Sequence, residues 1–156
     1  MTCRWDQWDD GTPVTREQRE AGRAFAAGIN ALLLPKRIQR RRTKGWRMPP
    51  NTVSVTRPSI FGNKFRVVND GTFWWCMIDR SHGLLFPTER GARRQATMMF
   101  REQIEHGHEA EKNFLRGKNL ACFCGDPPEG VPDVEWCHAA VWLEVVNADL
   151  IEGAKR

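Results

Sequence analysis

The sequence predicts a small, single-domain α/β fold in which helices and short strands form packed layers. The chain has 156 residues, the usual length of one domain with its own hydrophobic core. Its composition, with 40% apolar and 28% charged residues, is typical of a globular protein. Helical and strand-like periodicities follow one another in the order helix, short strands, helix, strand, helix. Together these observations favour a mixed α/β layer fold.

The first predicted helix covers residues 16–34. Thr15 precedes Gln18 by three residues, which is the spacing of a capping box. Small and apolar side chains then recur at helical spacing and Pro35 ends the helix. We expect three parts along the chain: an N-terminal arm and helix (residues 1–34), an α/β domain (residues 35–148) and a C-terminal tail (residues 149–156).

Short strands are expected in the next part of the chain. A basic connector comes first, residues 36–50, in which Gly45 and the Pro49-Pro50 pair exclude one continuous helix. Alternating or β-branched residues and turn-forming residues follow. They predict, in order, a strand around residues 53–55, a turn at 58–63, a strand at 65–68, a tight turn at 69–71 and a strand at 73–78.

The second half of the sequence predicts a long helix, a buried strand and a last helix. Thr88 and Glu89 open the long helix, which Gly107 interrupts before it continues to Leu115. Gly117 has the position of a C-terminal cap. The strand is expected at residues 120–124, followed by a loop rich in Gly, Pro and Asp at 125–133 and a helix at 135–146. A Cys-rich loop therefore joins the last strand to the last helix.

Composition also limits where the protein works. No apolar run approaches the roughly 20 residues that span a bilayer, and the polar, acidic N-terminus does not resemble a secretory signal. We therefore expect a protein of the cytoplasm, or of the host cytoplasm if a phage encodes it, with no membrane partner. Five cysteines are an odd number in such a chain, so metal binding or thiol chemistry explains a cysteine cluster better than a disulfide framework.

Cys122, Cys124, Cys137 and His138 form the densest cluster of reactive residues. On a strand, Cys122 and Cys124 point to the same side, with Cα atoms about 6.5–7 Å apart. The loop that follows can bring Cys137 and His138 back to them. A tetrahedral zinc ion needs sulfur atoms roughly 3.8 Å apart, which a bent strand allows. The sequence therefore predicts a metal site, for Zn²⁺ or another soft metal, made of these four residues.

Two other interpretations of the cluster remain open. A thiolate at a helix N-terminus has a lowered pKa, so Cys137 can be a catalytic nucleophile with His138 beside it as the base. Alternatively, all the cysteines are small buried apolar residues, as free cysteines often are.

A basic segment, residues 36–47, carries seven of the 24 basic residues and no acid. Such a segment can follow a phosphate backbone, with one tryptophan as a stacking surface. The alternative is a solvated linker. The candidate phosphate or nucleic-acid contacts here are Arg40, Arg41, Arg42, Lys44, Trp46 and Arg47.

The turn at residues 57–63 is a second candidate anion site. Pro58 and Gly62 fix its backbone, and Arg57, Ser59 and Asn63 supply hydrogen-bond donors for a phosphate or carboxylate. The alternative is a purely structural loop, whose polar groups form hydrogen bonds within the protein.

These stretches together resemble the domain of unknown function 4326 family (DUF4326), found in bacteria and bacteriophages, notably actinobacterial ones. The resemblance covers residues 35–148. The stretches that carry it are PKRIQRRRTKGWRMP at 35–49, VTRPSIFGNKF at 55–65, LRGKNLACFC at 115–124 and CHAAV at 137–141.

The resemblance implies that Arg57, Gly62 and Asn63 share one site with the three cysteines and the histidine, but it supplies no activity. Two positions depart from the family pattern, in which Pro usually follows the turn Asn and Asp usually stands two residues after the His. This chain has Lys64 and Ala140 there. If the family Asp is catalytic or supports a ligand, this copy is either inactive or uses another group in its place.

Three functional hypotheses follow from the sequence. In the first, the protein binds nucleic acid or a nucleotide through the basic segment and the Arg57 turn, with zinc in the Cys/His site. In the second, it is a thiol-dependent enzyme acting on an anionic, nucleotide-like substrate, with Cys137 or Cys124 as the nucleophile, His138 as the base and the Arg57 turn orienting the substrate. In the third, it is a non-catalytic phage protein that binds a host factor through residues 1–34.

Overall fold

The computed structural model describes residues 13–150 and has the mixed α/β architecture that the sequence predicts. Contacts divide the chain into two units, one that includes helix α1 and one that spans Pro35–Asp149, and each is described by itself. Among residues 13–150, no helix is both long enough and apolar enough to cross a membrane.

Helix α1 (Arg16–Leu33) begins with the predicted capping box. The amide of Thr15 donates to Gln18 Oε1 at 2.9 Å, and the amide of Gln18 donates to Thr15 Oγ1 at 3.2 Å. Two amides that have no partner within the helix are thereby satisfied.

The sheet that positions the functional site is parallel. Its strands are β1 (Arg37–Gln39), β6 (Asn119–Cys122) and β2 (Thr52–Ser54), with β6 in the middle. Both neighbours run parallel to β6. Because parallel strands end at the same edge, the chain leaving all three strands emerges on one side of the sheet. In α/β sheets this carboxyl edge is the usual place for a ligand site.

The second sheet is an antiparallel meander of β3 (Arg66–Asn69), β4 (Trp74–Met77) and β5 (Gly83–Phe86). Asp70 closes the predicted tight turn between β3 and β4: its carboxylate accepts hydrogen bonds from the amides of Thr72 and Phe73 and from the Trp75 indole.

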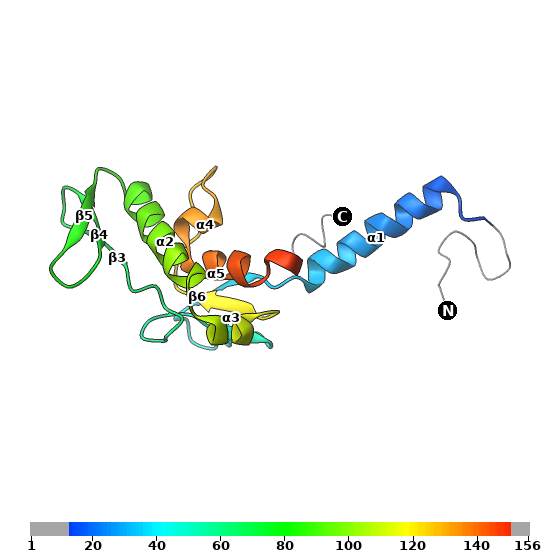
Figure 1. The fold of residues 1–156 in the computed structure, drawn as a ribbon, viewed down its shortest axis with the longest axis horizontal. Helices are drawn as coiled ribbons and strands as arrows, with labels where there is room; N and C mark the ends of the chain where they lie inside the picture. The colour runs from blue at the N-terminus through cyan, green and yellow to red at the C-terminus, as the bar shows by residue number, and fades with distance from the viewer. Residues whose placement is uncertain (1–12, 151–156) are drawn as a thin grey trace. The chain divides into compact units, whose positions relative to one another are not determined.

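Helices α2 (Glu89–Glu105), α3 (Glu109–Leu115), α4 (Asp133–Trp136) and α5 (His138–Val146) complete the Pro35–Asp149 unit (Figure 1). Helix α5 packs on β6 and β1, and α2 contacts α4 and α5 as well as all three strands of the meander. Helix α2 thus joins the two sheets.

The core lies between α2, α5 and the parallel sheet. Phe100 of α2 meets Trp142 of α5 edge-to-face, with ring centroids 5.7 Å apart. Trp142 is 1% exposed, and its indole N–H donates to the carbonyl of Phe61 at 2.9 Å. Leu120 of β6 and Val55, which follows β2, are fully buried. Such a packed core holds the carboxyl edge of the sheet rigid.

Three elements differ from the sequence-based expectation. Strand β1 lies inside the stretch expected to be only a connector, and β5 was not expected at all. The single helix expected at residues 135–146 is divided in two by Cys137, whose backbone is extended (φ −133°, ψ 124°). The division matters for function, because it turns the cysteine out of the helical path.

Candidate metal centre and adjoining pocket

The structure brings the four predicted metal-binding residues to one point. One ligand atom from each of Cys122, Cys124, Cys137 and His138 lies within 4.8 Å of all the others. The Sγ atoms of Cys122 and Cys137 are 3.2 Å apart, and Cys124 Sγ lies 3.3 Å from His138 Nδ1. These four residues can therefore hold a metal ion.

Two pieces of backbone place these ligands. Cys122 is the last residue of β6, and Cys124 follows beyond the end of the strand. Cys137 is the N-cap of α5 and His138 is its first residue. The ligands thus sit where the carboxyl edge of the sheet meets a helix N-terminus.

The ring of His138 is oriented by a second contact. Its Nε2 lies 2.7 Å from the carbonyl oxygen of Val55, in the turn after β2. A carbonyl oxygen only accepts hydrogen bonds, so Nε2 carries the proton and donates it. The lone pair of Nδ1 then points at the sulfur atoms. Histidines that bind metals usually have this arrangement, in which the distal N–H is held by a carbonyl or carboxylate.

Protonation of the cluster follows from the crowding of three thiols. Hydrogen bonds from Cys124 and then from Cys137 lower the pKa of Cys122, while the same contacts with Cys122 raise the pKa of Cys124 and of Cys137. Burial lowers the pKa of His138, which keeps its imidazole neutral. Of the three thiols only Cys122 has a lowered pKa, and a bound divalent cation would favour ionisation of all three sulfurs.

The donor set fits zinc. Three thiolates and one imidazole are a common composition for closed, four-coordinate structural zinc sites. Atom separations up to 4.8 Å bracket the roughly 3.8 Å between ligands of a tetrahedral zinc site. Cys122 and Cys137 are fully buried, whereas Cys124 and His138 are partly exposed. The cluster thus has a dry side within the core and a side that faces outward.

Arg37 supports the cluster from β1. Its guanidinium donates to the carbonyl of Cys124 at 3.1 Å and pairs with the carboxylate of Asp126. Burial opposes the charge of Arg37, but attraction to Cys137 and the other nearby anions raises its pKa overall. Zinc bound by three thiolates would carry one net negative charge, which a cation at this position would stabilise.

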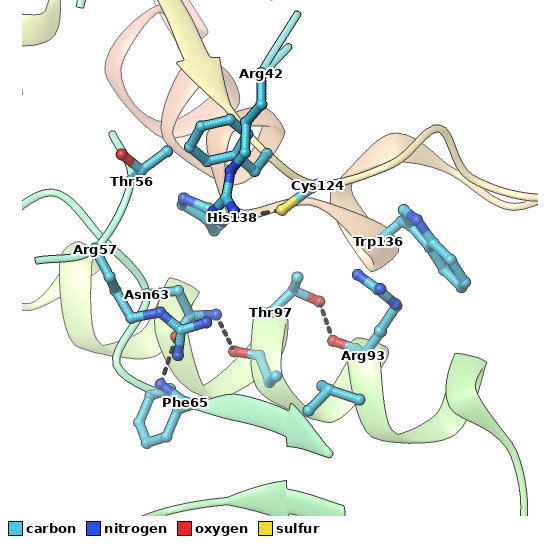
Figure 2. A pocket seen from close by; sticks show the side chains of 13 residues that line it. Arg42, Thr56, Arg57, Asn63, Phe65, Arg93, Thr97, Cys124, Trp136 and His138 are labelled. Carbon is cyan, nitrogen blue, oxygen red and sulfur yellow. Dashed lines mark hydrogen bonds between the residues drawn. The ribbon is translucent and has the colours of Figure 1, made fainter. Parts of the chain in front are cut away.

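A pocket of about 390 Å³ adjoins the outward side of the cluster. Cys124 and His138 form part of its wall, and the dashed line in Figure 2 marks the contact between them. No acidic side chain is among the residues that line it. The volume lies near the lower end of the roughly 300–1,000 Å³ that is typical of small-molecule sites.

Three arginines, hereafter the pocket arginines Arg42, Arg57 and Arg93, line this pocket from three separate segments (Figure 2). They come from the chain after β1, the turn after β2, and α2. Arg93 pairs with Glu89 at 2.7 Å. Within residues 13–150, Arg42 and Arg57 make no ion pair. Burial, and then repulsion from Arg66, lowers the pKa of Arg57, and attraction to Cys124 offsets part of this effect.

Two of the pocket arginines lie over aromatic rings. The Arg42 guanidinium lies 4.9 Å from the ring centroid of Phe123, and that of Arg93 lies 4.3 Å from the ring centroid of Trp136. Such contacts restrict the guanidinium groups. Because Arg93 Nε already donates to Glu89, its remaining N–H groups, like those of Arg42, are the ones that can meet an oxyanion.

The predicted phosphate-binding residues divide into two groups. Arg42, Arg57 and Asn63 line the pocket, but both ends of the Asn63 amide are engaged: Nδ2 donates to the carbonyl of Ala96 and Oδ1 accepts from the amide of Phe65. The remaining candidates are not among the lining residues; they are Arg40, Arg41, Lys44, Trp46, Arg47 and Ser59.

Two of those remaining candidates are used within the protein. Arg40 donates to the hydroxyls of Ser54 and Thr56 at 2.8 and 3.0 Å and stacks on Phe123. The hydroxyl of Ser59 accepts from the amide of Phe61, which stabilises the turn. Trp46 is half-buried. The last three candidates, all cations, are exposed; they are Arg41, Lys44 and Arg47.

The structure also bears on the predicted nucleophile. Cys137 is fully buried, and the hydrogen bond of the His138 Nδ1 atom is with Cys124. Cys124 is the cysteine that lines the pocket. If a thiol of this cluster reacts with a ligand in the pocket, the geometry favours Cys124.

Sequence analysis missed several pocket residues. Arg93 and Thr97 lie on α2, where arginines are frequent and none stands out by its spacing. Phe123, between two of the cysteines, is 41% exposed, and two arginines lie over its ring. The sequence signal that could have revealed the stacking was an aromatic residue between two cysteines, in a chain that also carries the arginine-rich segment 36–47.

The family model described as Domain of unknown function (DUF4326) matches residues 38–148, which confirms the resemblance seen in the sequence. Comparison with curated proteins and with solved structures finds no match.

Proposed function

The chain belongs to the DUF4326 family, a domain of unknown function, and from the geometry of its site we propose that it binds a phosphate-bearing, nucleotide-sized ligand beside a structural zinc centre. Cys122, Cys124, Cys137 and His138 hold the zinc. The pocket arginines hold the phosphate. The zinc fixes the turns that carry the pocket wall and takes no part in chemistry.

A single observation carries this proposal. Three arginines from three separate segments line one pocket together with Cys124 and His138, and no carboxylate lines it. A cavity with uncompensated positive charge selects an anion of matching charge. Planar guanidinium groups bind phosphate and carboxylate oxygens in bidentate fashion. A volume of about 390 Å³ then limits the ligand to the size of a nucleotide or smaller.

The zinc centre is placed to organise this pocket. Cys124 and His138 belong both to the cluster and to the pocket wall. His138 also ties the cluster to the turn after β2 through the carbonyl of Val55, two residues before Arg57. Metal binding therefore fixes β6, α5 and the Arg57 turn relative to one another.

The experiment is calorimetric titration of the zinc-loaded protein with adenosine monophosphate and with inorganic phosphate. Arg57→Ala is expected to weaken the binding of both ligands about tenfold to hundredfold, because a lost charge-assisted hydrogen bond costs about 1.5–3 kcal/mol. Arg80→Ala is the matched control, since Arg80 is an exposed arginine between β4 and β5, outside the pocket. Equal affinities of the two variants would contradict the proposal.

One observation favours a second candidate, a thiol-dependent enzyme. Cys124 and His138 are in hydrogen-bond contact at the pocket wall, and Val55 orients the histidine, as in a nucleophile–base–orienting group arrangement. The raised pKa of Cys124 weighs against it, because the reactive form is the thiolate. Iodoacetamide labelling separates the two functions. A thiol enzyme has one cysteine that reacts fast at neutral pH in the zinc-free folded protein. In a structural zinc centre, bound zinc slows the labelling of Cys122, Cys124 and Cys137 alike.

A further inference from the structure

The basic segment continues directly out of the pocket, and this continuity points to a more specific ligand. Arg42 belongs to both features: it lies within residues 36–47 and it lines the pocket. Resting on the proposed phosphate pocket, we infer that its ligand is the phosphorylated end of a nucleic-acid strand. The terminal nucleotide occupies the pocket, and the strand leaves it along the exposed cations Arg41, Lys44 and Arg47.

The charge of the pocket matches a terminal phosphate better than an internal one. An internal phosphodiester carries one negative charge, whereas a phosphate monoester with a second pKa near 6 carries about 1.5–2 at pH 7. Within residues 13–150, Arg42 and Arg57 are the two pocket arginines without an ion pair, and Arg93 is partly neutralised by Glu89. Two free cations thus face a group with nearly two charges.

The size of the pocket also favours an end. A volume of about 390 Å³ admits a single nucleotide-sized group. An internal nucleotide would need to be extruded from its strand to enter, which costs a few kcal/mol when the strand is paired. A terminal nucleotide stacks on one neighbour instead of two and is therefore unstacked at lower cost, in a paired or a single strand.

The basic segment offers cations outside the pocket that have no internal task. Arg37 and Arg40 are used within the fold, by Asp126 and by the hydroxyls of Ser54 and Thr56. In contrast, three cations of the segment are exposed and form no ion pair in the part of the chain that the structure describes; they are Arg41, Lys44 and Arg47.

The local backbone keeps these cations near the pocket mouth. The amide of Trp46 donates to the carbonyl of Thr43 at 3.2 Å, which closes a turn after Arg42. Even a fully extended chain would place the Cα atom of Arg47 no more than about 18 Å from that of Arg42. Trp46 is half-buried within the same turn and gives a base one aromatic surface to stack on.

The test is fluorescence anisotropy of the zinc-loaded full chain with single-stranded DNA of about ten nucleotides. One pair of oligonucleotides carries the fluorophore at the 3′ end and either a phosphate or a hydroxyl at the 5′ end. A second pair has the ends reversed. We expect one of the two phosphorylated ends to bind at least about tenfold more tightly than its hydroxyl counterpart, in keeping with one charge-assisted contact.

Two variants separate the pocket from the segment. Arg57→Ala should remove the preference for phosphate while leaving weak binding of both strands. The triple replacement of Arg41, Lys44 and Arg47 by alanine should weaken both strands, keep the preference, and reduce the slope of log affinity against log salt by about 2. A charge-matched control replaces three exposed arginines outside the segment that form no ion pair among residues 13–150; they are Arg19, Arg23 and Arg80.

Each outcome decides one statement. Equal affinity for phosphate and hydroxyl ends of both polarities would overturn the end-recognition inference. The inference would also be overturned if adenosine monophosphate bound as tightly as the phosphorylated strand and the triple variant behaved like its control. The pocket would then bind phosphate without recognising a strand. If neither the mononucleotide, inorganic phosphate nor any strand binds, the proposed function itself is wrong.

Discussion

Replacing Cys122 by alanine tests whether the cysteine cluster is a metal centre or only part of the packed core. Cys76 supplies the matched control, because both side chains are 0% exposed and both belong to the hydrophobic core. Cys122 lies in the Cys/His cluster, whereas Cys76 lies on β4 and is not among the four clustered residues. Loss of packing should therefore be similar in the two variants, typically about 1 kcal/mol.

The metal contributes a further amount only where its ligands are intact. Zinc at about 100 times its dissociation constant stabilises the folded state by about 2.7 kcal/mol. For a unit of the size of Pro35–Asp149, each kcal/mol shifts the melting temperature by about 4 °C. Zinc should thus raise the melting temperature of the wild type and of Cys76→Ala by roughly 10 °C, and that of Cys122→Ala by far less.

Differential scanning calorimetry with a zinc buffer and with a chelator gives all three differences. With chelator the two variants should melt close together; with zinc they should separate. The reasoning is refuted if zinc shifts Cys122→Ala as much as Cys76→Ala, or if it shifts neither variant nor the wild type.

Three other perturbations have defined outcomes. Gly62→Ala should weaken phosphate binding and cost about 1–3 kcal/mol of folding free energy, because a Cβ atom there would lie 2.7 Å from the Arg57 amide nitrogen. Gly107→Ala is the control, since a Cβ atom at that position would have its nearest neighbour at 3.9 Å; in the same calorimetric assays it should change neither quantity. Phe123→Ala should lower affinity for adenosine monophosphate severalfold with little change in melting temperature, since one of the pocket arginines loses the ring it stacks on; unchanged affinity would count against preorganised arginines. Hydrogen bonds from the amide of Phe73 and from neighbouring groups hold the pKa of Asp70 at about 2, below its usual 3.8. The stabilising effect of the Asp70 carboxylate is therefore present above about pH 4 and is lost as the pH falls toward 2. Asp70→Ala should lose less stability over that pH range than the wild type, and an Asp70 carboxyl that titrates near pH 4 by NMR would disprove the prediction.

Much of the fold was predictable because its signals are local. The capping box at Thr15 marked the start of α1, and Thr88 marked the start of α2, where its hydroxyl accepts from the amide of Gly91. The tight turn around Asp70 was predictable for the same reason, since its side chain bonds its own neighbouring amides.

The missed elements depend on partners far away in the sequence. Strand β1 has three residues in a basic stretch, and it exists because Ile38 pairs with Ala121 of β6, more than eighty positions later. Nothing in the local pattern indicates such a pairing. The break at Cys137 was missed because the apolar spacing runs through it, although the extended backbone there is what turns its sulfur toward Cys122.

The candidate site shows the same division. The four soft ligands could be predicted from residue type, since free cysteines and a histidine gathered within 17 positions suggest a metal. The pocket could not, because it is assembled from the parallel sheet and α2. Without β1, the sequence does not show that Arg42 and Arg57 leave the same edge of one sheet as Cys124.

The most direct test of the metal centre is X-ray absorption at the zinc edge, on protein prepared with zinc and freed of excess metal. We predict one zinc per chain with three sulfur ligands at about 2.3 Å and one nitrogen ligand at about 2.0–2.1 Å, and a spectrum that loses one sulfur in Cys122→Ala. Folded protein that retains no zinc, or zinc surrounded only by oxygen and nitrogen, would contradict the assignment of Cys122, Cys124, Cys137 and His138 as a metal centre.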